Sequence, residues 1–221
     1  MSQPAHRRIF LLVLMTVLIL SACRKRLDPE APYVLIPIGS QGRLLPEHSP
    51  VRIVKEGITL EVTALTAPQR SAWLRRRLEI DQDPLVRRGL SDRFLTFRLV
   101  LRATGKLPVH IESQSIRLWP GLKEGGISPL DYTRVYELLR PDKESAANAK
   151  EVENFMRGIY DGPIYIDPGQ GREGLLLIKK PSAYAEHFLL KLSFVQVGSK
   201  TLQVSFPFSR QLLGRDDHVG K

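Results

Sequence analysis

Apolar and polar residues alternate along much of the chain from residue 51 onward. Successive side chains of a β-strand point to opposite faces, so apolar residues at every second position indicate a half-buried strand. The pattern predicts strands at residues 51–54, 58–65, 94–102, 109–111, 116–118, 175–178, 187–197 and 200–208. The last two flank Gly198 and Ser199, a pair that favours a hairpin. About eight short strands without alternating helices predict a mainly β protein built as an antiparallel β-sandwich.

Two neighbouring segments interrupt the strands with apolar residues at helical spacing. Ser128 is expected to cap the first helix, with Pro129 in its first turn and Pro141 ending it. Asp142 is expected to cap the second helix. The apolar positions are Tyr132, Val135, Tyr136 and Leu139 in the first helix and Val152, Phe155, Met156 and Ile159 in the second. The sequence therefore predicts a two-helix insert at about residues 128–158, packed against the sandwich.

The first residues follow neither pattern. Residues 9–20 are almost wholly apolar; two arginines precede them, and Ser21, Ala22 and Cys23 follow. A basic start, an apolar stretch and small residues predict a secretory signal peptide, residues 1–22, that is cleaved. The apolar stretch has 12 residues, fewer than the roughly 20 that a membrane-spanning helix needs. An ordinary signal peptide or an N-terminal anchor with an incidental cysteine is the alternative.

The run Leu20-Ser21-Ala22-Cys23 resembles the bacterial lipobox, in which a leucine and two small residues precede a cysteine. This resemblance to bacterial lipoproteins implies cleavage before Cys23, diacylglycerol attached to its sulfur and, often, a fatty acid such as palmitate on the new amino group. One acyl chain holds a protein only marginally at a membrane, whereas two or more hold it stably. Arg24, not aspartate, follows the cysteine. In a Gram-negative cell the same resemblance then implies the outer membrane, facing the periplasm.

Residues 23–50 are expected to form a lipid-anchored tether, because their five prolines prevent long regular elements. Arg24, Lys25 and Arg26 stand beside the attachment point. Each could pair with anionic headgroups and contribute about 1 kcal/mol to membrane binding. A solvated start of the tether is the alternative interpretation of these three residues.

The sandwich is expected over residues 51–210, followed by a flexible C-terminal tail at 211–221. Residues 94–118 comprise a long strand, the turn Thr104-Gly105-Lys106 and a second strand. This arrangement resembles the Ig-like modules of small secreted bacterial lipoproteins and implies an Ig-like sandwich. The resemblance implies a scaffold and no particular activity.

Composition narrows the classes of partner and site. The chain has 221 residues, a net charge of +10 and one cysteine. The charge suits nucleic acid, phospholipid or acidic polymers, but a secreted, membrane-tethered protein is not expected to meet nucleic acid. A single cysteine excludes a disulfide framework within the chain and a zinc site of several thiolates. No histidine pair has metal-ligand spacing, so neither a metal nor a cofactor is expected.

Arginines gather around Trp73 in a segment expected to be a short amphipathic helix. Arginine suits phosphate groups because its planar fork donates two parallel hydrogen bonds. The candidate anion-binding residues are Arg70, Arg75, Arg76 and Arg77. A solvated basic helix whose Trp73 packs on the sandwich is the simpler interpretation. The G-x-G-x-x-G run at residues 169–174 precedes a strand, not a helix, which argues against dinucleotide binding.

Tyrosine is frequent at protein interfaces, so Tyr132, Tyr136 and Tyr160 are a candidate partner surface, with core packing as the alternative. No nucleophile elbow or other catalytic constellation is present in the sequence. We therefore expect no enzyme but a membrane-anchored envelope module for binding or assembly. Its expected partners are membrane lipid, through acylated Cys23, and an envelope protein. The alternatives are an envelope hydrolase whose site only the fold assembles and a basic module that binds anionic polymer or lipid.

Overall fold

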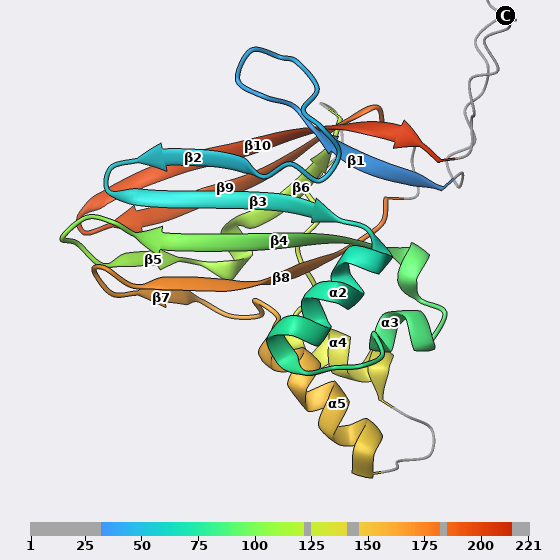
Figure 1. Cartoon of the computed structure of the whole chain (residues 1–221). Coiled ribbons are helices and arrows are strands. Elements are labelled where there is room, and N and C mark those ends of the chain that lie inside the picture. The colour runs from blue at the N-terminus through green and yellow to red at the C-terminus, as the bar shows by residue number, and fades with distance from the viewer. Residues whose placement is uncertain (1–31, 122–124, 141–145, 182–184, 214–221) are drawn as a thin grey trace, which may run out of the picture. The chain divides into compact units, whose positions relative to one another are not determined.

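The computed structural model describes residues 32–121, 125–140, 146–181 and 185–213. These residues form two antiparallel sheets and a group of helices (Figure 1). The expected mainly β architecture, an antiparallel sandwich with a helical insert, is confirmed. The expected signal peptide lies outside the described residues.

The first sheet contains β1 (Tyr33–Pro37), β10 (Lys200–Leu212), β9 (His187–Val197), β5 (Val109–Ile111) and β7 (Ile164–Ile166), in that order, and β6 (Ile116–Pro120) also pairs with β9. The β9–β10 hairpin turns at Gly198 and Ser199, as expected. β1 pairs with the far end of β10, and Tyr33 lies opposite Leu212. The sandwich therefore extends into the expected tether at one end and into the expected tail at the other. β1 is part of the sandwich because it pairs with β10 and its side chains Leu35 and Ile36 are buried.

The second sheet contains β2 (Val51–Lys55), β3 (Ile58–Leu65), β4 (Phe94–Ala103) and β8 (Gly171–Lys179), in that order. Alternate side chains of β4 point into the space between the sheets, where Phe97, Leu99 and Leu101 are fully buried. Phe97 meets Phe208 of the opposite sheet with ring centroids 5.3 Å apart. These inward faces form the main core.

Helices cover the outer face of β8 (Figure 1). They are α2 (Ala67–Leu78), α3 (Pro84–Arg87), α4 (Tyr132–Leu139) and α5 (Ala146–Arg157). Two short 3-10 helices are present at Ser91–Arg93 and Ser113–Ser115, and the second lies beside β9. Leu175 and Leu177 of β8 join the helical core, whereas Leu176 and Ile178 join the main core. Both faces of β8 are thus buried, which explains its continuous apolar run.

The insert differs from its expected form in two respects. Asp131, not Ser128, caps α4: its Oδ1 accepts a hydrogen bond from the Arg134 backbone N–H at 2.8 Å. Pro129 instead bridges β8 in an extended conformation. The helical core also includes Trp73 and Leu74 of α2, so it is larger than the expected two helices. Packing of the insert against its own domain is confirmed, since Val135 and Leu139 of α4 belong to this core.

Candidate binding pocket and basic surface

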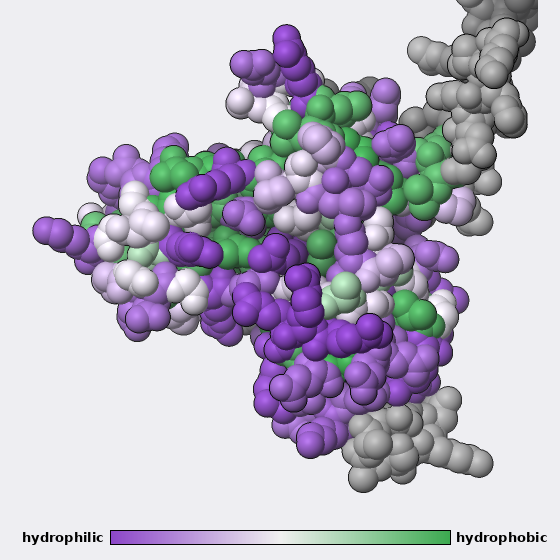
Figure 2. All heavy atoms as spheres, viewed as in Figure 1, coloured by the Kyte–Doolittle hydropathy of each residue, from purple (hydrophilic) through white to green (hydrophobic). Residues whose placement is uncertain are grey.

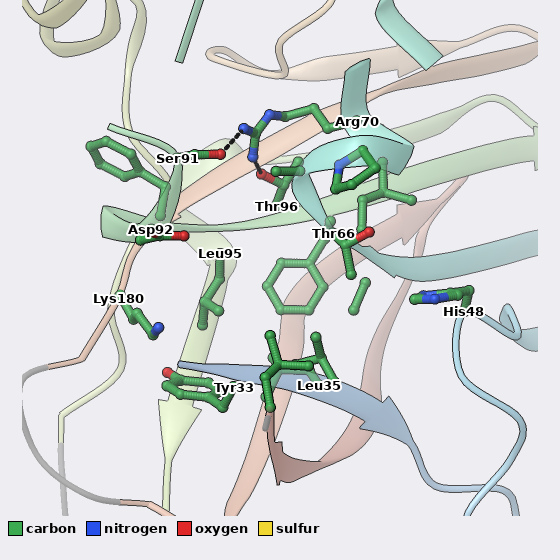
Figure 3. Close-up of a pocket in the computed structure, with 18 residues that line it drawn as sticks. Tyr33, Leu35, His48, Thr66, Arg70, Ser91, Asp92, Leu95, Thr96 and Lys180 are labelled. Carbon is green, nitrogen blue, oxygen red and sulfur yellow. Dashed lines mark hydrogen bonds between the residues drawn. The ribbon is translucent and has the colours of Figure 1, made fainter. Parts of the chain in front are cut away.

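A pocket of about 290 Å³ opens at one corner of the sandwich (Figure 3). It lies where β1 of the first sheet faces the end of β3 and the start of β4 in the second. We call it the corner pocket. Its volume is close to the lower end of the range typical of small-molecule sites, about 300–1,000 Å³.

Both sheets contribute apolar walls to the corner pocket. The apolar side chains that line it include Val34, Leu35, Leu65, Phe94, Leu95 and Phe97. The polar lining residues include Thr66 just before α2, Asp92 of the 3-10 helix at Ser91–Arg93 and Thr96 of β4. Apolar walls with a few convergent polar groups are the usual composition of a ligand site.

Lys180 and Tyr33 lie side by side at the corner pocket (Figure 3). The Lys180 ammonium is 4.1 Å from the centroid of the Tyr33 ring, a cation–π contact. Burial lowers the pKa of Lys180, and the nearby carboxylate of Asp92 opposes that change. Burial also raises the pKa of Tyr33 to about 12, although the Arg210 guanidinium opposes it. The tyrosine therefore keeps its proton at neutral pH.

Arg70 also lines the corner pocket, but each nitrogen of its guanidinium donates a hydrogen bond inside the protein. Its Nε donates to Asp83 Oδ2 at 2.7 Å, Nη1 to Thr96 Oγ1 at 2.9 Å and Nη2 to Ser91 Oγ at 2.7 Å. The side chains of Arg70 and Asp83 are each 1% exposed. The network joins α2, α3 and β4. In this structure Arg70 is therefore not available to an external polyanion, in contrast to its sequence-based grouping with Arg75–Arg77.

The other three candidate arginines differ among themselves. Arg75 and Arg76 are exposed and bond weakly to carbonyl oxygens of their own segment. Arg77 instead donates to Glu173 of β8. Helical spacing distinguishes Arg77 from Arg75 and Arg76. Arg77 follows the i, i+3, i+4, i+7 rule with Arg70, Trp73 and Leu74, so these four residues share the helix face toward the protein.

Glu173 collects three donors from two elements. Trp73 Nε1 and Arg98 Nε each donate to its Oε1 at 2.6 Å, and Arg77 donates to Oε2. Burial alone would raise the pKa of Glu173, but these hydrogen bonds outweigh it and lower the pKa to about 2. Such a carboxylate stays ionised and is poorly suited to act as a general acid near neutral pH. It fastens α2 to the outer face of the second sheet.

The three tyrosines of the candidate partner surface do not lie together. Tyr132 and Tyr136 stack on exposed positions of α4, with centroids 6.1 Å apart. Tyr160 is buried in the main core. Only the first two could meet a partner in this structure. Asp131 and Asp161, carboxylates that a hydrolase could use, line one small cavity of about 170 Å³, but Asp131 is already engaged as the α4 cap.

Cys23, Arg24, Lys25 and Arg26 lie outside the described residues. Within the described ranges, no three His, Cys, Asp or Glu side chains gather closely enough to hold a metal ion. No helix in that part of the chain is long and apolar enough to span a membrane. No protein-family model and no curated protein matches the chain.

Sequence reasoning did not find Lys180 or Glu173. Lys180 follows directly after the end of β8, a position typical of a solvated strand end. Glu173 lies inside the glycine-rich run, and its partners Trp73 and Arg98 are 100 and 75 residues away. No local pattern could connect residues so far apart.

Proposed function

We propose that this protein is a lipid-anchored binding protein of the bacterial envelope and that its corner pocket takes the apolar part of a small amphipathic anion. The observation that carries the proposal is the apolar pocket with the Lys180 ammonium beside it. An ammonium attracts carboxylate, phosphate or sulfate groups, and the aliphatic walls favour a hydrocarbon chain. The activity is binding, without a chemical step.

The proposed anchor supplies a reason for a ligand of this class. Tyr33 lines the corner pocket and comes ten residues after Cys23. A fully extended chain of that length reaches at most about 35 Å. If Cys23 carries acyl chains, the pocket stays within that distance of the membrane surface, where amphipathic anions are concentrated.

Labelling tests the anchor. Cells that express the full chain would be fed a fatty acid with a clickable tag, with Cys23→Ser as the control. We expect label on the unaltered protein and none on the variant. Unlabelled wild-type protein would exclude the lipoprotein assignment.

Direct binding tests the pocket. The full-length protein would be reconstituted in phosphatidylcholine nanodiscs and titrated with radiolabelled decanoate. Replacing Lys180 with glutamine should weaken binding about tenfold, because a hydrogen bond to a charged group contributes about 1.5–3 kcal/mol. Lys179→Gln makes the same charge change at an exposed neighbouring position and should alter affinity by less than about twofold.

Decanol provides the second arm, since it has the same tail without the charge. Lys180→Gln should affect decanol binding far less than decanoate binding. Equal affinities of the two lysine variants for decanoate, or no saturable binding above empty nanodiscs, would refute the assignment of the pocket.

A further inference from the structure

The described helices leave the outer face of the first sheet open, since they pack over β8 of the second sheet (Figure 1). Along β9 the buried Leu190 and Leu192 alternate with Leu189 and Lys191, which are partly exposed on the outer side. We call this surface the open sheet face. Its outward side chains include Arg117, Trp119, Tyr165, Lys191, Phe194 and Gln196, and none of these is buried.

Positive charge gathers on the open sheet face without acidic neighbours in the sheet. The six described strands of the first sheet contain no aspartate or glutamate. Arg117 of β6 and Lys191 of β9 lie directly opposite each other in the strand register, so their side chains share one face. Neither forms an ion pair with a carboxylate in the described part of the chain. Like charges placed in this way destabilise a sheet, and an anion bound beside them would relieve that cost.

The outer face of the second sheet is different. It carries charges of both signs, because Glu61 of β3 and Glu173 of β8 lie among its arginines. Figure 2 shows this side of the molecule, where hydrophilic side chains gather over α2 and the neighbouring strands. Strands without carboxylates therefore distinguish the first sheet from the second.

Trp119 joins the two cations into one cluster. The Lys191 ammonium lies 4.9 Å from the centroid of the Trp119 ring, a cation–π contact. A Cβ on Gly126 would come within 2.8 Å of Trp119 Cε2 and 3.0 Å of Arg117 Cβ, so the glycine leaves room for both side chains. Such contacts reduce the conformational entropy that the cluster would lose on binding a partner.

Exposed aromatic side chains extend the open sheet face beyond this cluster. Phe194 is 61% exposed and Tyr165 is 66% exposed. Between the pairs Leu192–Val204 and Val195–Leu202 the register shifts, and this β-bulge leaves Phe194 on the outer side. Tyr165 stacks on His110 with ring centroids 4.3 Å apart. Aromatic rings beside lysine and arginine are typical of protein surfaces at a membrane–water interface.

From these observations we infer that the open sheet face docks on the surface of a bilayer rich in anionic phospholipid. Arg117 and Lys191 would contact headgroup phosphates. Trp119 and Tyr165 would lie at the level of the headgroups, and Phe194 would enter the boundary of the acyl chains. The inference rests on the proposed lipid anchor for proximity to the bilayer, and the corner pocket plays no part in it.

Two other occupants fit the open sheet face less well. Sugar hydroxyls need hydrogen-bond partners, and the exposed ring of Phe194 supplies none, which disfavours an acidic polysaccharide. A second copy of the chain would place one pair of Arg117 and Lys191 against another. Like charges brought together at an interface oppose association.

The test places a dye on each sheet of the full-length protein, reconstituted in phosphatidylcholine nanodiscs with or without phosphatidylglycerol. Gln196→Cys supplies an exposed position on the open sheet face, and Val54→Cys supplies an exposed control on the second sheet. Each cysteine is labelled with nitrobenzoxadiazole, and the unaltered protein measures any label on Cys23. Dithionite in solution reduces the dye unless a membrane shields it.

We expect phosphatidylglycerol to slow dye reduction at Gln196→Cys at least about fivefold and to leave Val54→Cys within about twofold. Adding Arg117→Gln/Lys191→Gln should lower the ratio of shielded to unshielded dye about thirtyfold, because two basic contacts to anionic lipid are lost. Arg75→Gln/Arg76→Gln makes the same charge change on α2 and should alter the ratio by less than about twofold. Thermal unfolding of each variant verifies that the fold is retained.

Equal losses in the two double variants, or equal shielding at both dye positions, would overturn the inference. So would shielding by soluble polygalacturonate, which identifies a polysaccharide partner, or shielding that rises with the number of chains per disc, which identifies a second copy. Decanoate binding at the corner pocket, measured on the same samples, should be unchanged in Arg117→Gln/Lys191→Gln. A failure of the open sheet face is thereby distinguished from a failure of the proposed function.

Discussion

The buried ion pair between Arg70 and Asp83 should hold the first two helices to the sandwich. Replacing Arg70 with methionine keeps most of the side-chain volume but leaves a buried carboxylate without its cation. Asp83 would retain the hydrogen bond from the Leu85 N–H at 2.9 Å. Removing one partner of a buried ion pair costs about 3–5 kcal/mol. For a domain of this size each kcal/mol lowers Tm by about 2–4 °C, so we expect a loss of about 6–20 °C.

A double-mutant cycle separates the ion pair from general packing. Arg70→Met, Asp83→Leu and the combined variant would be unfolded with urea and by heat as full-length proteins. The combined variant should be more stable than Arg70→Met, although the lost α3 cap still costs about 1 kcal/mol. The exposed Arg75→Met control should change the free energy of unfolding by less than about 0.5 kcal/mol. A loss below about 1 kcal/mol for Arg70→Met, or additive losses in the combined variant, would refute this reasoning.

Three further predictions concern the helices and β8. The pKa of Glu173 is lowered from 4.5 to about 2, so its ionised form stabilises the fold above pH 4.5 and that contribution disappears as the pH falls toward 2. The Tm advantage of the unaltered protein over Glu173→Gln should therefore shrink across this range, and a constant difference would contradict the assignment. Gly174→Ala should cost about 1–3 kcal/mol of unfolding free energy because its Cβ would meet the Tyr160 ring at 2.8 Å, whereas Gly162→Ala, with open space around it, is the matched control. Leu139→Ala should cost about 2–5 kcal/mol because the side chain is 1% exposed, against much less for Leu138→Ala at 37%; equal losses on chemical unfolding would show that α4 does not pack as described.

Local patterns predicted those elements that keep one face toward the same core along their whole length. β4 has one face toward the main core, so its alternation was visible in the sequence. β1 and β7 were not predicted, because β1 is a continuous apolar run inside the proline-rich stretch and β7 is a three-residue run between Pro163 and Pro168. β7 is nevertheless well buried, since Ile164 and Ile166 belong to the main core. Its place in the sheet depends on pairing with β5, a contact between distant segments.

The candidate sites depend even more on distant contacts. The sequence indicated that arginines near Trp73 are unusual, but it could not show which of them lose their freedom to buried partners. Arg70 meets Asp83 and Thr96, which are 13 and 26 residues away. Glu173 of β8 meets Arg98 of β4, and these two strands become neighbours only in the sheet. Local sequence thus predicted the type of chemistry, while the fold determined which residues can perform it.

Lys180 and Arg102 lie near opposite ends of β4. The Lys180 N–H donates to the carbonyl of Arg93, just before the strand begins, and Arg102 is nine positions further along. At about 3.3 Å per residue the two are roughly 30 Å apart. Effects of changes separated by more than about 7–10 Å usually add. Combining Lys180→Gln with Arg102→Gln should therefore leave the loss of decanoate binding equal to that of the lysine variant alone. A combined loss larger than this would mean that the second sheet couples the two positions.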